Sequence, residues 1–277
     1  MAIQWYPGHM TKARRVLEET MPAQDVIIEV LDARMPHASE NPVVTELRRD
    51  KPCIKVLSKS DLADPEITEA WLAHFEKSPN VRALAITTER QQDARIKIPA
   101  LCKEIVLHPR GLGKTVRAMI VGIPNVGKST LINTLMERKV AKVGDEPAVT
   151  KAQQRVTLKN GMTLADNPGI MWPKIEDERG GLCLALGGAI PDNAIDYESV
   201  ALFGARFFLA KYPDRLKARY KLDTLPEIPA DLLVEIGKRR GCLKSGGIID
   251  MHKAGDVLVH DFRDGALGRI SLESPRS

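Results

Sequence analysis

Short apolar runs alternate with stretches of helical spacing through the first 166 residues of this 277-residue chain. The apolar runs have the length and flanks of buried strands and are expected at 25–31, 52–58, 81–86, 117–122, 155–158 and 162–166. Helical spacing recurs near 9–21, 40–50, 64–77, 91–106 and 128–138. This alternation predicts an α/β fold, doubly wound around a mainly parallel sheet.

Beyond about residue 176 the pattern changes to helices alone. Helical stretches are expected near 195–211, 213–221, 229–240 and 249–260. The length of the chain suits one sizeable α/β domain and a smaller second one. We therefore expect an α/β domain over 1–176 and a small all-helical domain over 177–277.

The most specific motif lies where the expected strand 117–122 meets the helix 128–138. It reads Gly122-Ile123-Pro124-Asn125-Val126-Gly127-Lys128-Ser129, the GxxxxGKS pattern of a phosphate-binding loop. Glycines allow backbone N–H groups to surround phosphates at a helix N-terminus, and the lysine adds a point charge. We expect nucleotide contacts from Asn125, Val126, Gly127, Lys128, Ser129 and Thr130, with the Ser129 hydroxyl on Mg²⁺.

A second motif, Asp166-Asn167-Pro168-Gly169, follows the strand 162–166. The Asp166 carboxylate is expected to face the water shell of Mg²⁺, and the Gly169 N–H to reach the γ-phosphate. Thr150 lies between the two motifs and is the candidate for the threonine that binds Mg²⁺ when GTP is present. Lys128, Thr150 and Gly169 are accordingly expected to act in catalysis.

The third motif, Ser58-Lys59-Ser60-Asp61, follows the strand 52–58 and reads the base. The Asp61 carboxylate can accept from guanine N1–H and N2–H₂, whereas adenine presents an acceptor at N1. The Lys59 stem is expected to cover the base plane. Ser58 replaces the usual asparagine and is shorter, which predicts a weaker tie to the phosphate loop. Thr87 and Thr88 are expected near the guanine O6.

These motifs come in a permuted order along the chain. An ordinary GTPase runs phosphate loop, DxxG and then NKxD, whereas here the base-reading motif comes first. Circular permutation keeps the pocket and moves the chain ends. The segment after Gly169 therefore leads directly into the C-terminal third.

Further runs carry a family resemblance: Trp5-Tyr6-Pro7-Gly8-His9-Met10, Asp32-Ala33-Arg34-Met35-Pro36, Asp261-Phe262-Arg263 and Leu267-Gly268-Arg269. With the permuted motifs they make the chain resemble the YlqF/RbgA family, ribosome biogenesis GTPase A, nearly end to end. The resemblance implies a bacterial or organellar factor that hydrolyses GTP while assisting late maturation of the large (50S) ribosomal subunit. It also implies GTP, GDP, the 50S subunit with its precursor, and 23S-type ribosomal RNA as partners.

Two residues bear on how hydrolysis occurs. Ile170 follows Gly169, where many small GTPases carry a glutamine that orients the attacking water. The resemblance points instead to His9, whose neutral imidazole could accept from water; the alternative is a surface histidine packed near Pro7-Gly8. Asn125 is expected either to help bind K⁺ beside the phosphates or to hydrogen-bond within its loop.

The chain carries a net charge of +5 and a pI near 9.0, which suits an acidic partner. Basic side chains gather in two C-terminal segments: Arg206, Lys211, Arg215, Lys217, Arg219, Lys221, Lys238, Arg239, Arg240 and Lys244. Such clusters fit binding to an RNA backbone, with a solvated helix face as the alternative. The resemblance favours ribosomal RNA.

Composition limits the remaining readings. No apolar run reaches the ~18 residues of a membrane span, and the four scattered cysteines are expected to be buried free thiols in a reducing cytoplasm. We expect a cytoplasmic monomer that does not bind membranes. The alternative function is a nucleotide-gated RNA-binding module with incidental GTP turnover, which Ser58 and Ile170 permit. An ATP-dependent enzyme is disfavoured by Asp61.

Overall fold

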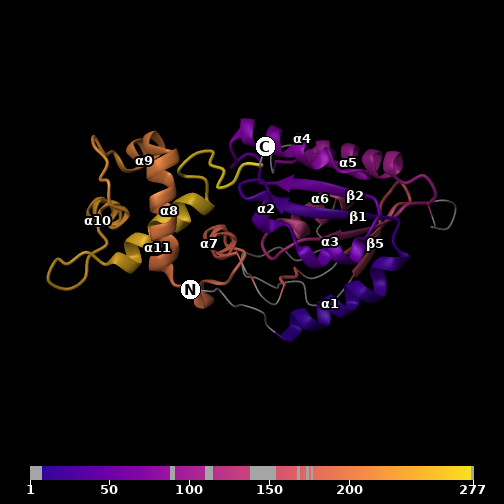
Figure 1. The fold of residues 1–277 in the computed structure, drawn as a ribbon, viewed down its shortest axis with the longest axis horizontal. Coiled ribbons are helices and arrows are strands. Elements are labelled where there is room, and N and C mark those ends of the chain that lie inside the picture. The colour runs from indigo at the N-terminus through magenta and orange to yellow at the C-terminus, as the bar shows by residue number, and fades with distance from the viewer. Residues whose placement is uncertain are drawn as a thin grey trace.

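The computed structural model describes residues 8–87, 91–109, 115–137, 154–166, 169–172, 175 and 177–275. Its centre is a six-stranded sheet with the order β3-β2-β1-β4-β6-β5 (Figure 1). The strands are β1 (Val26–Asp32), β2 (Cys53–Ser58), β3 (Val81–Ala85), β4 (Arg117–Val121), β5 (Gln154–Thr157) and β6 (Thr163–Asp166). All neighbours pair in parallel except β5 and β6, which are antiparallel. The predicted α/β fold with a mainly parallel sheet is confirmed.

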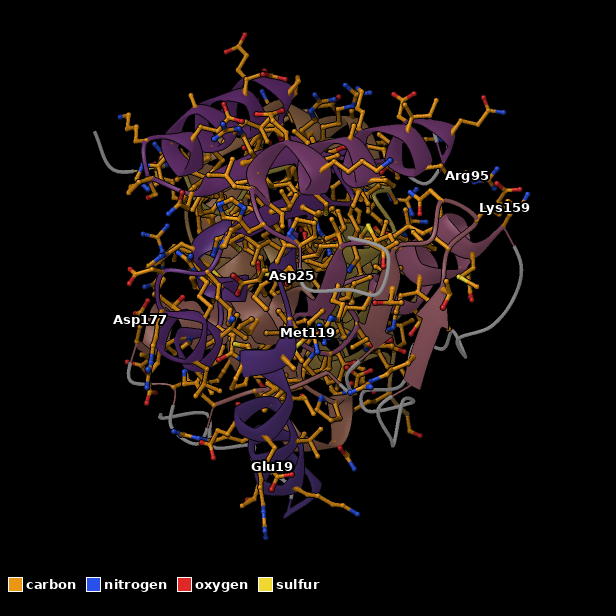
Figure 2. The ribbon with its side chains drawn as sticks, turned by 90° about the vertical axis from the view of Figure 1, so that its right-hand side faces the viewer. Glu19, Asp25, Arg95, Met119, Lys159 and Asp177 are labelled. Atoms are coloured by element: carbon orange, nitrogen blue, oxygen red, sulfur yellow. The ribbon has the colours of Figure 1, made fainter. Side chains whose placement is uncertain are left out.

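The central strands are mostly apolar because helices cover both faces of the sheet. Glu29 of β1 and Lys55 of β2 are buried exceptions that form an ion pair with each other. Successive residues of a strand point to opposite faces of the sheet and so belong to different cores. Ile28 of β1 and Ile120 of β4 belong to the first core, and Ile27 of β1 and Met119 of β4 belong to the second. Met119 lies in the interior of the protein, whereas Glu19 and Lys159 lie at its periphery (Figure 2).

Five helices build these two layers. The first face packs against α5 (Gln91–Ile105) and α6 (Lys128–Met136). The second packs against α1 (Gly8–Thr20), α3 (Pro42–Arg48) and α4 (Pro65–Glu76). Two short turns, η1 (Met21–Ala23) and α2 (Pro36–Ser39), complete this part of the chain.

The C-terminal third is helical, as predicted. It contains α7 (Glu178–Leu186), η3 (Asp192–Ala194), α8 (Tyr197–Lys211), α9 (Pro213–Tyr220), α10 (Pro229–Arg240) and α11 (Met251–Arg263). In Figure 1, α8 to α11 form the part opposite the sheet, with α7 between them and the sheet. Gly255 allows α11 to approach α8 closely, because a Cβ there would lie 3.0 Å from that of Ala201. Helix α7 was not predicted.

One apolar core runs from the α5 and α6 face of the sheet through α7 into α8, α10 and α11. The segment after α11 then returns to the sheet part, and the C-terminal end lies beside α4 (Figure 1). There the Ile270 N–H donates to the Leu62 carbonyl at 2.9 Å, and the Trp71 indole N–H to the Glu273 carbonyl at 3.3 Å. The domain boundary expected at residue 176 stays a prediction.

Candidate nucleotide-binding site

The loop between β4 and α6 has the backbone that a phosphate-binding loop requires. Gly122 has a φ of +154°, and a Cβ there would lie only 2.6 Å from the Val30 carbonyl oxygen. Gly127, just before α6, has a φ of +98°. Both positions therefore exclude larger residues. Ser129 and Thr130 occupy the first turn of α6, where N–H groups lack helical acceptors.

Lys128 and Asp166 place two opposite charges beside this loop. The Lys128 side chain is buried, and its ammonium donates to the Ile123 carbonyl at 3.0 Å. Burial lowers the pKa of Lys128 to about 8, and burial raises the pKa of Asp166 to about 6; each charge partly offsets the shift of the other. Asp166 Oδ1 is buried and has no hydrogen-bond partner among the described residues. A ligand that supplies donors or positive charge would satisfy this oxygen.

The segment that follows β6 is held against the loop. A Cβ on Gly169 would lie 2.9 Å from the Pro124 backbone and 3.1 Å from Lys128 Nζ, so only glycine fits. The Ile170 N–H donates to the Gly122 carbonyl at 3.2 Å. The Asn41 amide donates to the Ile170 carbonyl at 2.8 Å. The backbone after Gly169 is thus fixed from two sides.

The base-reading motif lies on the other side of the same loop. The Ser58 hydroxyl lies 2.6 Å from the Val126 carbonyl and 2.9 Å from the Leu31 carbonyl, and its single proton can serve one of them at a time. Serine therefore does reach the phosphate loop. Asp61 Oδ1 is buried and, like Asp166 Oδ1, lacks a hydrogen-bond partner among the residues that the structure describes. Such an orphaned acceptor suits the N–H groups of guanine.

Lys59 is tied to Asp32, a residue that the sequence singled out only through the family resemblance. Its ammonium lies 3.1 Å from Asp32 Oδ2, and Lys59 itself has a φ of +55°. Burial alone would raise the pKa of Asp32, but Arg34 and Lys59 together hold it well below its usual range. Burial lowers the pKa of Lys59, and the Asp32 charge opposes that shift. The pairing follows from register, because Asp32 ends β1 directly beside Ser58 of β2.

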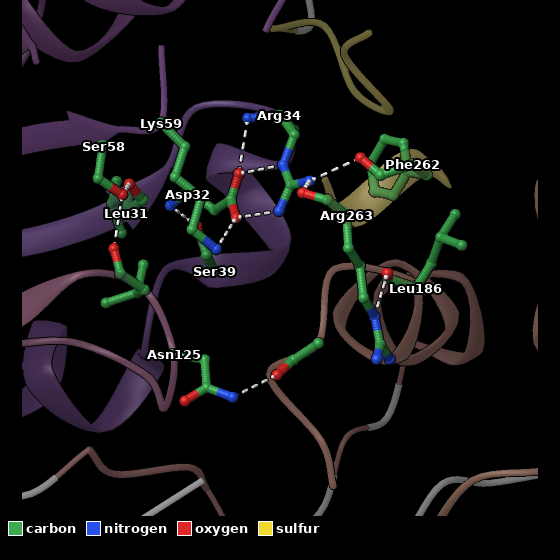
Figure 3. Close-up of polar contacts among 12 residues, drawn as sticks. Leu31, Asp32, Arg34, Ser39, Ser58, Lys59, Asn125, Leu186, Phe262 and Arg263 are labelled. Carbon is green, nitrogen blue, oxygen red and sulfur yellow. Dashed lines mark hydrogen bonds and ion pairs between the residues drawn. The ribbon is translucent and has the colours of Figure 1, made fainter. Parts of the chain in front are cut away.

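The phosphate loop also contacts the C-terminal third. The Asn125 side-chain amide donates to the Gly188 carbonyl at 2.9 Å, just beyond α7 (Figure 3). This contact was in neither of the two expectations for Asn125.

Several predicted site residues are not placed. Thr88 and Thr150 lie outside the described residues, whereas Thr87 lies two residues beyond Ala85, the last residue of β3. His9 lies in the first turn of α1, and its side chain is outside the description.

The basic residues of the C-terminal third divide into two groups. Arg219 donates to the Asp261 carboxylate through Nε and Nη2, and Arg240 lies 3.7 Å from the same carboxylate. Arg239 donates to the Lys221 carbonyl. Lys238 pairs with Glu235 and Lys244 approaches Asp250 at 4.0 Å. The other group comprises Arg206, Lys211, Arg215, Lys217 and Lys221, which are exposed, as are Lys238, Arg239, Arg240 and Lys244 of the first group.

The compositional expectations can be compared with the structure. All four cysteines are buried and free of disulfides, as predicted. No helix within the described ranges is long and apolar enough to cross a membrane. Over the same part of the chain, no three His, Cys, Asp or Glu side chains gather as a metal-binding group.

The glycine-bounded loop, the buried lysine and the flanking DxxG and base-reading segments define a P-loop GTPase domain with permuted motif order. A family model described as 50S ribosome-binding GTPase matches residues 117–189. The chain is 47% identical to Ribosome biogenesis GTPase A of Bacillus licheniformis over 281 residues, which cover 99% of each protein. It is 31% identical to Mitochondrial ribosome-associated GTPase 1 of Ictalurus punctatus, over 97% of this chain and 92% of the relative.

Solved structures agree. The GDP-bound structure of YlqF superposes with a TM-score of 0.69 at 25% identity, over 95% of this chain and 100% of that one. GNP-bound YlqF from T. maritima gives a TM-score of 0.67 at 26% identity, over 96% of this chain and 99% of that one. The chain belongs to the ribosome biogenesis GTPase A family.

Proposed function

We propose that this GTPase assists late maturation of the large ribosomal subunit and binds ribosomal RNA in a nucleotide-dependent way. One observation carries the nucleotide assignment. Two buried carboxylate oxygens, on Asp61 and Asp166, have no hydrogen-bond partner among the described residues. Asp61 follows β2 and Asp166 ends β6, and strands β1 and β4 lie between these two in the sheet. The two oxygens fit the two ends of one ligand, a guanine base and a metal-bound triphosphate, with the phosphate loop between them.

The residues around the phosphates have distinct proposed roles. N–H groups of the loop and of Gly169 hold the phosphate oxygens, and Lys128 stabilises charge on the β- and γ-phosphates. Ser129, Thr150 and Asp166 would hold Mg²⁺, which when bound neutralises charge on the phosphate oxygens. Asn125 is a candidate to help bind K⁺ through its side-chain oxygen, while its amide donates to Gly188.

Water positioning requires a residue other than Ile170, whose side chain is apolar and buried. We propose His9 for this role, because α1 packs on the sheet part that carries the phosphate loop. Replacing His9 by Ala should slow particle-stimulated hydrolysis and leave GTP affinity nearly unchanged, since water positioning matters in the transition state. An equal loss of GTP affinity and of hydrolysis rate would indicate that His9 has a structural role in α1.

Ribosomal RNA is proposed to bind the exposed basic residues of α8 and α9. Within the part of the chain that the structure describes, the Lys211 and Lys217 ammonium groups form no ion pair, so they can neutralise phosphates without breaking a salt bridge there. The ion-paired group around Asp261 is better suited to holding α9, α10 and α11 together. We propose that the protein acts as a cytoplasmic monomer.

Sedimentation with 30S, 50S and 70S particles tests the proposal. The protein should pellet with 50S particles or their precursors more strongly in a non-hydrolysable GTP analogue than in GDP. Lys128→Ala, which weakens triphosphate binding, should remove that difference. Equal pelleting in both nucleotides would contradict the nucleotide dependence.

The turnover rate distinguishes a hydrolysing factor from a nucleotide-gated binding module. A hydrolysing factor should turn over GTP faster when large-subunit particles are present. An unchanged rate with intact nucleotide-dependent binding would favour the module.

A further inference from the structure

Asp32 and Arg34 form a buried ion pair directly behind the base-reading motif. Both side chains are 1% exposed. The guanidinium binds the carboxylate through two bonds, Nε to Oδ1 at 2.9 Å and Nη2 to Oδ2 at 2.8 Å (Figure 3). The Arg34 backbone N–H also donates to Oδ1, at 3.0 Å. This arrangement leaves the carboxylate one orientation.

The same carboxylate holds Lys59. The Lys59 ammonium shares Oδ2 with Arg34 at 3.1 Å. Lys59 has a left-handed backbone, which is unfavourable for a residue with a Cβ and persists where surrounding contacts impose it. The ion pair is one such contact. The orientation of Asp32 therefore decides where the Lys59 side chain lies.

The other side of Arg34 binds the end of α11. Arg34 Nη1 donates to the Phe262 carbonyl at 3.2 Å and to the Arg263 carbonyl at 3.3 Å. Its guanidinium carbon lies 4.6 Å from the centre of the Phe262 ring. A cation at a helix C-terminus is favourable because the last carbonyls lack helical donors. Arg34 thus joins the end of α11, 228 residues away, to Asp32 at the end of β1, which lies beside β2 and its base-reading motif.

We propose that Asp32 and Arg34 are positioning residues of the guanine site, through which the end of α11 sets the placement of Lys59. The inference rests on the proposed role of Lys59 at the base. A buried ion pair contributes little net stability, since desolvation offsets much of its attraction, but its bidentate geometry fixes orientation. Any shift of α11 on docking would be transmitted to the guanine pocket, and occupancy of the pocket would favour one position of α11.

A mutant cycle on GDP affinity tests the first step. The four proteins are the wild type, Lys59→Met, the pair variant Asp32→Asn/Arg34→Met, and the triple variant. The pair variant removes both charges together, so that neither Asp32 nor Arg34 is left as the unpaired half of the ion pair, and Lys59 loses the carboxylate that holds it. Because hydrogen bonds to charged groups are the strong ones, it should weaken GDP binding roughly tenfold in the wild-type background. It should cause almost no further loss in the Lys59→Met background.

The mutant cycle tests the positioning role of the ion pair separately from the base-reading role of Lys59. The same fold-loss in both backgrounds would show that the pair does not act through Lys59, and the inference would fail. An unchanged GDP affinity in Lys59→Met would instead refute the base-reading role and with it that part of the proposed function. Lys55→Met is the matched control. It breaks a buried ion pair with Glu29 on the same two strands, so it should lower stability and leave GDP affinity unchanged.

Hydrogen exchange tests the second step, the link to α11. GDP should protect amides 259–263 in the wild type and leave them unprotected in the pair variant. Equal protection in the two proteins would remove α11 from the inference. Thermal unfolding with and without nucleotide shows that each variant is folded before its affinity is compared.

Discussion

The Asn125 amide donates a 2.9 Å hydrogen bond to the Gly188 carbonyl. Asn125 belongs to the loop between β4 and α6, and Gly188 follows α7, so a phosphate-loop side chain contacts the C-terminal third directly. Arg263, at the end of α11, donates to the Leu186 carbonyl at the end of α7 (Figure 3) and also to the Ala185 carbonyl. The phosphate-binding loop and the helical C-terminal third are therefore connected in two ways: by the hydrogen bond of Asn125, and by the chain that leads from Gly169 toward α7.

Asn125→Ala should weaken the dependence of 50S binding on the nucleotide. One neutral hydrogen bond contributes about 0.5–1.5 kcal/mol, so the ratio of affinities in the GTP-analogue and GDP states should fall about two- to tenfold. Sedimentation in the two nucleotides measures it. Exchanging K⁺ for Na⁺ should lower wild-type turnover and leave the variant unaffected if Asn125 helps bind K⁺. An unchanged ratio would show that the Gly188 contact plays no part in coupling.

Asp61→Asn should reduce the preference for GTP over ATP. The substitution replaces one carboxylate acceptor by an N–H₂ donor that opposes the guanine N–H groups. The expected loss of GTP affinity is about tenfold or more, because charged hydrogen bonds contribute roughly 1.5–3 kcal/mol. Competition of labelled GDP with GTP and ATP measures the ratio. A wild-type ratio would place the base-reading site elsewhere.

Asp166→Asn should stabilise the nucleotide-free protein near pH 7 while impairing Mg²⁺-dependent turnover. The folded-state pKa of about 6 exceeds the ordinary aspartate pKa of 3.8, so the wild type loses stability as pH rises between these values. Asparagine avoids this loss, which is at most about 3 kcal/mol at roughly 1.4 kcal/mol per pKa unit. The advantage should vanish near pH 4. Urea unfolding from pH 4 to 7 tests this, and a pH-independent difference would contradict it.

Lys217 and Arg219 lie two residues apart on α9 and should respond differently to charge removal. Lys217→Gln should flatten the salt dependence of 50S binding by about 0.7–0.9 in log–log slope for one phosphate contact, without changing stability. Arg219→Gln should lower stability by about 1–3 kcal/mol, because the largely buried Asp261 loses its bidentate partner. Its effect on the salt slope should be smaller. The reverse pattern would assign RNA contact to Arg219.

The local elements and the motif contexts could be predicted from the sequence. Short, mostly apolar runs indicate all six strands, because a strand covered on both faces is mostly apolar. The phosphate loop could also be predicted, because its glycines occupy backbone positions that exclude a Cβ. Helix α7 was missed because glycine pairs bracket its apolar run at 180–181 and 187–188, and glycine pairs usually indicate turns. Its signal was Asp177, which caps the helix by accepting from the Arg179 N–H.

What the sequence determined by itself is therefore the six strands, most of the helices but not α7, and the three nucleotide motifs with their permuted order. Each strand, helix and motif depends on neighbours within a few residues, and the order of the motifs is read directly along the chain. Tertiary structure decided which distant groups meet. Arg34 reaches α11 across 228 positions and Asn125 reaches Gly188 across 63. These pairings have no local period, because they depend on which strand edge and which helix end the packed core brings together.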